Sequence, residues 1–127
     1  MLAIVAPGQG AQTPGFLSPW LTESAFADRL AWLSAVAGLD LTHYGTEADA
    51  ETIRDTAVAQ PLLVSAGLLA GEVLLAGAAA TTPIGVYAGH SVGELTAAGA
   101  TGVLTPEQAM VFVRERGRAM AEASAAT

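Results

Sequence analysis

Two short apolar runs, residues 2–6 and 84–88, contain Ile, Val and Tyr and predict buried β-strands. Each run is followed directly by a glycine-containing segment, residues 7–10 after the first and residues 89–93 after the second. Continuous apolar runs of this length, bounded by turn residues, are typical of parallel strands that are covered on both faces. The pattern therefore predicts an α/β protein with a parallel sheet.

Helical patterns fill most of the chain between these strands. One covers residues 18–37, with a break expected near Thr22 and an end at Gly38. Residues 39–46 are predicted to form a connecting loop, and residues 49–55 a short acidic helix.

Gln60 and Pro61 are predicted to open a long apolar helix. The stretch is long enough to span a bilayer, and Gly67 and Gly71 have the spacing of a membrane helix pair. Glu72, however, would lie near mid-membrane at a cost of about 3 kcal/mol. We therefore predict a buried helix of a soluble protein, with no membrane partner, in which the two glycines allow close packing.

The last helix has a clear start, because Thr105 and Gln108 have capping-box spacing and Pro106 occupies the first helical position. Residues 77–83 are expected to connect the long apolar helix to the second strand. Two strands cannot cover this much apolar helix. Either further strands escape detection, or the chain is one part of a larger domain.

The composition narrows the function classes. Of the 127 residues, 52% are hydrophobic and 13% charged, which predicts a folded core. Five basic residues against twelve acidic ones give a net charge of −7, which argues against nucleic acid as the partner. The chain has no cysteine, and its two histidines, His43 and His90, lack metal-ligand spacing, so no metal site is predicted.

The second strand leads into Gly89-His90-Ser91-Val92-Gly93, a G-x-S-x-G motif, and then into a helical pattern. Strand, motif and helix in this order are the layout of a nucleophile elbow. The glycines remove Cβ atoms that would clash in a sharp turn, and the helix N-terminus offers N–H groups to an oxyanion. We predict that Ser91 is the catalytic nucleophile; an ordinary glycine-rich turn is the alternative.

The segment after the first strand, Gly8-Gln9-Gly10-Ala11-Gln12, does not fit a phosphate-binding loop. Thr13 stands where a dinucleotide fingerprint requires its third glycine, and the chain has no lysine for a P-loop. What remains is a tight loop that either approaches a ligand with its backbone or simply turns the chain.

In the last helix Ala109, Val113 and Met120 are predicted to share an apolar face. Arg116 falls on the same face, between Ala109 and Phe112. A charge is not buried without a partner, so Arg116 must meet a structural carboxylate or an anionic ligand. The residues by themselves favour the structural carboxylate.

A nucleophilic serine also needs a general base. His90 is adjacent to Ser91 and would point away from it in an extended segment, and His43 would serve only if its loop folded over the elbow. Neither histidine is a convincing base.

Four segments together resemble the malonyl-CoA:acyl carrier protein transacylases and the related acyltransferase domains of fatty acid and polyketide synthases. Their order and spacing fit that family over essentially the whole chain. The segments are Pro7-Gly8-Gln9-Gly10-Ala11-Gln12, Gln60-Pro61, Gly89-His90-Ser91-Val92-Gly93-Glu94, and Arg116-Gly117 with Met120. The resemblance implies that residues 1–127 are the amino-terminal part of an α/β-hydrolase-like parallel-sheet subdomain, with the family's ferredoxin-like small subdomain absent from this chain.

The resemblance also implies roles for site residues. Ser91 would be the nucleophile, the backbone N–H groups of Gln9 and Val92 the oxyanion hole, and Arg116 the partner of the malonyl carboxylate, with Gln60 and His90 as further substrate-binding residues. An apolar residue such as Val92 after the serine is similar to malonyl-selective members, whereas methylmalonyl-specific domains often carry glutamine there.

The implied reaction transfers a malonyl group from malonyl-CoA to the phosphopantetheine thiol of an acyl carrier protein, through an acyl-serine. Coenzyme A enters as a thioester substrate, no cofactor is expected, and the expected location is cytoplasmic. Family members are much longer, and their second half supplies the catalytic histidine, so the missing carboxy-terminal half is an expected partner. A start at Met1, just before the first strand, implies the stand-alone enzyme.

Three alternatives stay open: an acyltransferase domain of a polyketide synthase, a serine esterase, and a non-catalytic fragment that needs its second half. An esterase for neutral substrates has no evident use for Arg116, whereas the lack of a base favours the fragment. A net charge of −7 would repel an acidic carrier protein, so docking would need a basic patch that the sequence does not locate.

Overall fold

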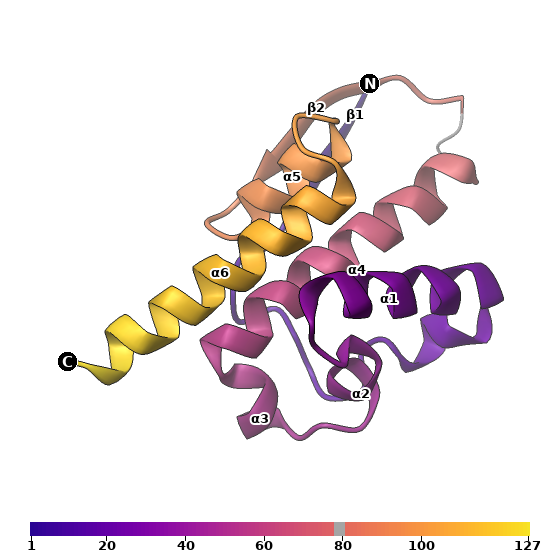
Figure 1. The fold of residues 1–127 in the computed structure, drawn as a ribbon. Coiled ribbons are helices and arrows are strands. Elements are labelled where there is room, and N and C mark those ends of the chain that lie inside the picture. Colours follow the sequence, from indigo (N-terminus) through magenta and orange to yellow (C-terminus); the bar gives the residue numbers. More distant parts are fainter. Residues whose placement is uncertain (78–80) are drawn as a thin grey trace.

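The computed structural model describes residues 1–77 and 81–127, and it confirms the α/β class (Figure 1). Strands β1 (Leu2–Ala6) and β2 (Ile84–Gly89) pair in parallel, and the chain between them passes through helices. Parallel neighbours need such a crossover, because a two-residue turn joins antiparallel strands. The other elements are the 3-10 helix η1 (Ser18–Thr22) and the helices α1 (Ser24–Ala37), α2 (Leu41–Thr46), α3 (Ala50–Arg54), α4 (Thr56–Ala76), α5 (Gly93–Ala100) and α6 (Pro106–Ala125).

The two strands end at the same level of the sheet. The register pairs Val5 with Ala88 and Ala6 with Gly89, so the last residues of both strands are neighbours. The loop after β1 and the turn after β2 therefore leave the sheet side by side. Ligands of open parallel sheets bind outside this carboxyl edge. The register thus brings together the two glycine-containing segments that the sequence singled out.

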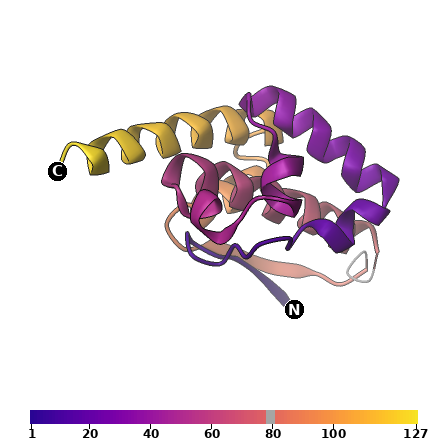
Figure 2. The same cartoon turned by 90° about the horizontal axis from the view of Figure 1, so that it is seen from below.

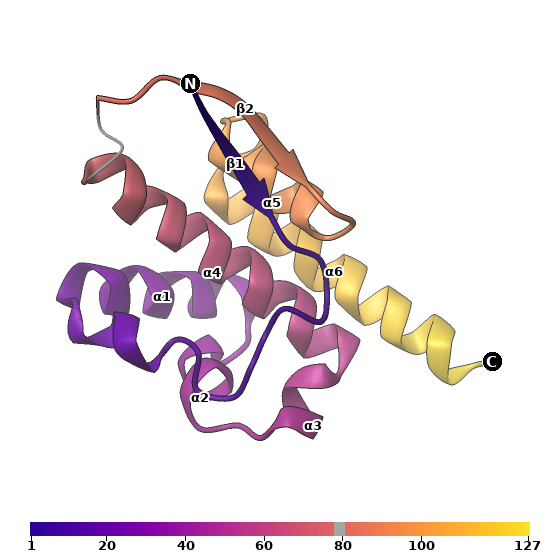
Figure 3. The ribbon, with the colours of Figure 1, turned by 180° about the vertical axis from the view of Figure 1, so that it is seen from behind.

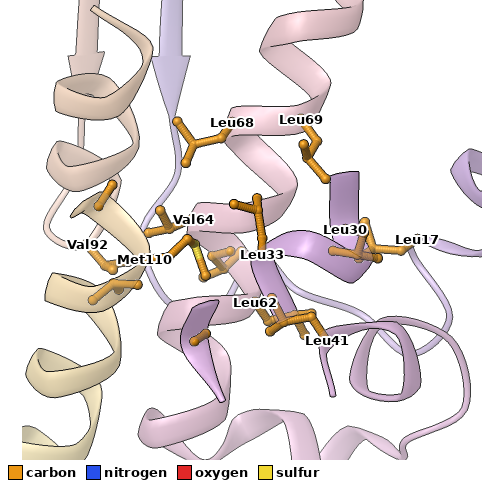
Figure 4. Packing of buried hydrophobic residues seen from close by; sticks show 14 of the residues in the cluster. Leu17, Leu30, Leu33, Leu41, Leu62, Val64, Leu68, Leu69, Val92 and Met110 are labelled. Atoms are coloured by element: carbon orange, nitrogen blue, oxygen red, sulfur yellow. The ribbon is translucent and has the colours of Figure 1, made fainter. Parts of the chain in front are cut away.

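The core is built around α4, which packs against α1, α5 and α6 (Figure 1). Figure 4 shows leucines of α1 and α4, among them Leu33 and Leu62, gathered near Met110 of α6 and Val92 of the turn after β2. All four side chains are buried, and burial of one such side chain is worth about 1.5–3 kcal/mol. In Figure 2 the strands lie along one side of the molecule, with α1 and α6 on the other.

Several predicted helix ends are confirmed. The break near Thr22 separates η1 from α1, and Gly38 closes α1 in the left-handed conformation, with a φ of 65°. The short acidic helix is α3, which Asp49 caps by accepting a hydrogen bond from the Thr52 N–H at 2.8 Å. These ends were predictable because each depends on one local residue type.

The capping box of the last helix is confirmed as well. The Gln108 N–H donates to Thr105 Oγ1 at 3.0 Å, and the Thr105 N–H donates to Gln108 Oε1 at 2.9 Å. Of the connection expected over residues 77–83, residues 78–80 lie outside the described residues.

The loop prediction for residues 39–46 was wrong, because they contain α2. The Asp40 carboxylate accepts a hydrogen bond from the His43 N–H at 3.1 Å and caps this helix. A helix this short shows no apolar periodicity. The feature of the sequence that could have predicted it is the capping residue Asp40.

The predicted start of α4 was also wrong by a turn. The helix begins at Thr56, where the Asp55 side chain accepts a hydrogen bond from the Ala57 N–H at 2.8 Å. Pro61 is buried inside the helix and has no N–H to donate to the Ala57 carbonyl. The helix therefore gives up one hydrogen bond at this position.

Helix α4 is a core helix, although its length and hydropathy would also suit a membrane span. A Cβ on Gly67 would lie 2.6 Å from Cγ2 of Thr96, so Gly67 lets α5 approach α4 closely. A Cβ on Gly71 would meet nothing within 4 Å among the described residues. The expectation of close packing therefore holds for Gly67 and fails for Gly71.

One face of the sheet is uncovered in the described part of the chain. Helix α5 packs against both strands from one side, as the view from behind shows (Figure 3). On the open side Val5 is 70% exposed and Val86 50% exposed. In the described residues the sheet consists of these two strands. As the sequence suggested, two strands are too few to cover the apolar helices.

Candidate active site

Ser91 lies in the turn between β2 and α5 with a left-handed backbone. Its φ is 55°, the one positive φ among the non-glycine residues that the structure describes. Such a conformation costs a non-glycine residue about 1–3 kcal/mol and is associated with functional sites. The serine is exposed at the surface. This strained strand-to-helix turn has the geometry of a nucleophile elbow.

The two glycines that flank Ser91 are required by close contacts. A Cβ on Gly89 would lie 2.1 Å from the backbone carbon and oxygen of Gly93. A Cβ on Gly93 would lie 2.4 Å from the carbonyl oxygen of Ala6. Backbone atoms cannot yield by that much, so the turn admits glycine alone at both positions.

His90 joins the elbow to the loop that follows β1. Its N–H donates to the carbonyl of Ala6 at 3.1 Å. Its ring nitrogen Nδ1 lies 2.6 Å from the point that a Cβ on Gly8 would occupy, so the missing side chain of Gly8 makes room for the ring. The His90 ring therefore packs against the first loop.

Two glutamine side chains hold that loop against the start of α4 and the end of α3. Gln9 Nε2 donates to Thr56 Oγ1 at 3.0 Å. Gln12 Nε2 donates to the Ile53 carbonyl at 3.1 Å, and Gln12 Oε1 accepts from the Gly10 N–H at 2.9 Å. The loop is therefore fixed by side chains, and the Gln9 backbone N–H has no acceptor among the residues that the structure describes.

The predicted oxyanion donors lie on the two segments that meet at the sheet edge. Val92 is the N-cap residue of α5, and its side chain is buried in the core. Within residues 1–77 and 81–127, neither the Gln9 nor the Val92 backbone N–H donates to a protein acceptor. Free N–H groups at a helix N-terminus and in a tight loop suit an anion.

Arg116 reaches the elbow from α6. Its Nη2 lies 3.5 Å from Ser91 Oγ, a long hydrogen bond, and its Nη1 donates to Gln60 Oε1 at 2.7 Å. Next to it, a Cβ on Gly117 would lie 3.0 Å from the carbonyl oxygen of Thr56. The missing side chain of Gly117 therefore lets α6 approach α4 closely enough for Arg116 and Gln60 to meet.

Arg116 forms no ion pair with a carboxylate in the described residues, so the structural carboxylate favoured by the residues alone was wrong. The apolar face is narrower than predicted: Ala109 and Val113 are fully buried, whereas Phe112 is 55% and Met120 43% exposed. Arg116 lies at the edge of this face and is half-buried. The Gln60 amide takes the place of a carboxylate.

Neither histidine forms a hydrogen bond with Ser91 Oγ in the described part of the chain. His43 lies on α2, which packs against α1 and α4. Its Nδ1 is 3.6 Å from the Glu47 carboxylate, and its ring meets that of Tyr44 edge-on. His43 therefore does not fold over the elbow.

Sequence reasoning gave Gln12 no role beyond membership of a motif, and it placed Met120 in a motif and on the apolar face of the last helix. In the structure Gln60 Nε2 donates to Met120 Sδ at 3.3 Å. The spacing could have indicated that Met120 lies near Arg116, because residues four apart lie on the same side of a helix. Gln12 carried no such signal, since its partner on α3, the Ile53 carbonyl, is remote in sequence.

The chain is similar to known malonyl transacylases. It is 47% identical over 125 residues to the malonyl CoA-acyl carrier protein transacylase of Mycobacterium tuberculosis, covering 98% of this chain and 41% of that protein. The crystal structure of MCAT from Mycobacterium tuberculosis matches with a TM-score of 0.87 and 48% identity, again over 98% of this chain and 41% of that one.

A second solved structure is PlMCAT:AntF (holo), a type II PKS acyl-carrier protein in complex with its malonyl-transacylase. It matches with a TM-score of 0.86 and 33% identity, over 95% of this chain and 39% of that one. The present chain thus spans well under half of the relatives it matches. The family model described as the acyl transferase domain matches residues 4–127, and the chain therefore belongs to the acyl transferase domain family.

Proposed function

We propose that this chain is the nucleophile-bearing part of a malonyl-CoA:acyl carrier protein transacylase. The observation that carries the proposal is the guanidinium of Arg116, 3.5 Å from Ser91 Oγ and held by the neutral Gln60 amide. Its positive charge is compensated by no carboxylate of the described residues and is available to an acyl group that itself carries one.

The proposed reaction has two half-reactions. Ser91 Oγ attacks the thioester carbonyl of malonyl-CoA and loses its proton to a base, the C–S bond breaks, and coenzyme A leaves as the thiol after taking up that proton. The phosphopantetheine thiol of an acyl carrier protein then attacks the malonyl-serine ester, which restores the Ser91 hydroxyl. No cofactor enters either half-reaction.

The backbone N–H groups of Gln9 and Val92 are the proposed oxyanion donors. They belong to the loop and the elbow that the strand register brings together, and both lack a protein acceptor in the described residues. A donor of this kind is worth about 3–4 kcal/mol of transition-state stabilisation. His90, packed against the same loop, is proposed to border the acyl site.

Val92 is proposed to favour malonyl over methylmalonyl through the packing of its side chain, which affects the position of the turn. Its side chain is buried among core residues such as Met110. Glutamine, which would have to bury an amide here, would shift the turn. The test is whether Val92→Gln changes the preference between these two acyl groups.

Residues 1–127 are proposed to be the amino-terminal part of an α/β-hydrolase-like large subdomain. The uncovered sheet face with Val5 and Val86, and the lack of a histidine on Ser91 in the described residues, both fit a domain completed by further chain. That further chain would supply the general base and the basic patch for the carrier. A cytoplasmic location, where malonyl-CoA is available, is part of the proposal.

One experiment separates the proposal from its rivals. The complete natural protein is incubated with malonyl-CoA, and its intact mass is followed before and after addition of a phosphopantetheinylated acyl carrier protein. A transacylase gives a malonyl adduct that moves to the carrier. An esterase gives free malonate without a carrier, and a non-catalytic protein gives no adduct; either result would contradict the proposed function.

A further inference from the structure

Gln60 is a buried amide with two partners of different kinds. Its side chain is 1% exposed, its Oε1 accepts from Arg116 Nη1 at 2.7 Å, and its Nε2 donates to Met120 Sδ at 3.3 Å. A guanidinium is a donor only, and a thioether sulfur is an acceptor only. One orientation of the amide therefore satisfies both partners, with the oxygen towards Arg116.

Met120 reinforces that orientation. Without an acceptor at this position the Nε2 group would be buried without a partner, which is unfavourable, and Arg116 alone would favour the present orientation of the amide. In the opposite orientation two donors, the amide NH₂ and the guanidinium, would face each other. Met120 is 43% exposed, so its side chain is not simply a piece of the core.

Gln60 is suited to its place because it is neutral. A glutamate would hold Arg116 with a shorter, charge-assisted hydrogen bond, but it would also cancel the positive charge. The amide instead holds the guanidinium beside Ser91 through its dipole alone. A charge that is positioned but not neutralised is what recognition of an anionic acyl group requires.

We propose that Gln60 and Met120 form a neutral clamp that sets the specificity for acyl groups bearing a carboxylate. Met120 holds the Nε2 end of the Gln60 amide, and Gln60 positions Arg116 without compensating its charge. Both act as positioning residues through Arg116. The inference deepens the proposed function and rests on it.

The test measures kcat/KM for malonyl-CoA and for acetyl-CoA in the complete natural protein, and compares the two as a ratio. Met120→Leu removes the sulfur acceptor and should lower the malonyl preference by about fivefold, whereas Met120→Gln restores an acceptor and should retain it. Gln60→Glu should lower the preference by at least about tenfold. Met110→Leu is the matched control, because Met110 is fully buried and makes no polar contact in the described residues.

The outcomes are distinct. A wild-type protein that prefers malonyl-CoA, with a ratio reduced in Met120→Leu and Gln60→Glu but not in Met110→Leu, supports the clamp. If Met120→Leu or Gln60→Glu keeps the wild-type ratio, the clamp is overturned, whereas the proposed function is unaffected. A wild-type protein that transfers no malonyl group overturns the proposed function, and the clamp with it. If thermal unfolding shows that Met120→Leu does not fold, Met120→Gln and Gln60→Glu decide.

Discussion

Arg116 Nη2 lies 3.5 Å from Ser91 Oγ, although 25 positions separate the two residues in the chain. Three structural features bring them together: the sharp turn that exposes Ser91, the close approach of α6 to α4 at Gly117, and the Gln60 amide that holds the guanidinium. The proposed nucleophile thus lies beside a cation that no carboxylate of the described residues compensates, a combination suited to distinguishing an anionic acyl group from a neutral one.

Arg116→Ala should shift the acyl preference from malonyl towards acetyl. Loss of a charge-assisted hydrogen bond costs about 1.5–3 kcal/mol, so the ratio of kcat/KM for malonyl-CoA over acetyl-CoA should fall at least about tenfold. Arg118→Ala is the control, because Arg118 is exposed and pairs with Glu115 and Glu122 on its own helix. Equal losses for both thioesters in Arg116→Ala would mark Arg116 as a structural residue.

Gly67→Ala and Gly71→Ala should have opposite effects on stability. The new Cβ at position 67 meets the Thr96 methyl at 2.6 Å, and overpacking of this kind costs about 1–3 kcal/mol. At position 71 the Cβ meets nothing within 4 Å in the described residues, and replacing glycine inside a helix gains up to about 1 kcal/mol. Urea unfolding of both variants checks the pair; a Gly71→Ala variant destabilised as much as Gly67→Ala would contradict the packing described for α4.

Glu107 should contribute to stability at neutral pH and lose that contribution in acid. The Trp32 indole N–H, which donates to its carboxylate at 2.9 Å, its own backbone N–H and Arg29 hold the pKa of Glu107 below its ordinary value near 4.5. Because the folded-state pKa is the lower one, the contribution is present above pH 4.5 and disappears as the pH falls through the folded-state pKa.

The Glu107 side chain is 40% exposed, so solvent screens the interaction and its worth stays below about 1 kcal/mol. The measurement is the free energy of unfolding of the wild type and of Glu107→Gln at pH 7 and pH 3. The variant should be less stable at pH 7, and the difference should be smaller at pH 3. An equal difference at both pH values would show that the charge of Glu107 is not involved.

The strands, the elbow and the ends of most helices were predictable from the sequence, because each depends on neighbouring residues. Gly38 ends α1 because glycine readily adopts the left-handed conformation found there. Thr105 and Gln108, three residues apart, form the capping box of α6. The short α2 and the first turn of α4 escaped prediction, because their caps, Asp40 and Asp55, stand outside any apolar period. Pro61 added to the error, since a buried proline inside a helix looks like a helix start.

The partner of Arg116 could not be predicted, because it depends on how two distant helices approach each other. Helical periodicity placed Arg116 on an apolar face and suggested a carboxylate, whereas the structure places it at the edge of that face, beside Gln60. The meeting of Arg116 and Gln60 depends on the close approach of α6 to α4 at Gly117, where an added Cβ would lie 3.0 Å from the Thr56 carbonyl oxygen, and no local pattern encodes this approach.

Residues 1–127 expressed alone should fold poorly. Val5 and Val86 lie exposed on an uncovered sheet face, and both outer strand edges are unpaired in the described residues. Near-ultraviolet dichroism and thermal unfolding should show no cooperative transition, and a dye for apolar surface should bind. Full malonyl transfer by a cooperatively folded fragment would contradict this and would make His43 or His90 the base.

The most direct measurement is the site of malonyl attachment. The complete natural protein and its Ser91→Ala variant are incubated with malonyl-CoA, quenched in acid and mapped by peptide mass spectrometry. The wild type should carry one malonyl group on the peptide that contains Ser91, and Ser91→Ala should carry none while its dichroism and unfolding temperature remain those of the wild type. A malonyl group mapped to another residue, at the same stoichiometry in both proteins, would contradict the assignment of Ser91 as the nucleophile.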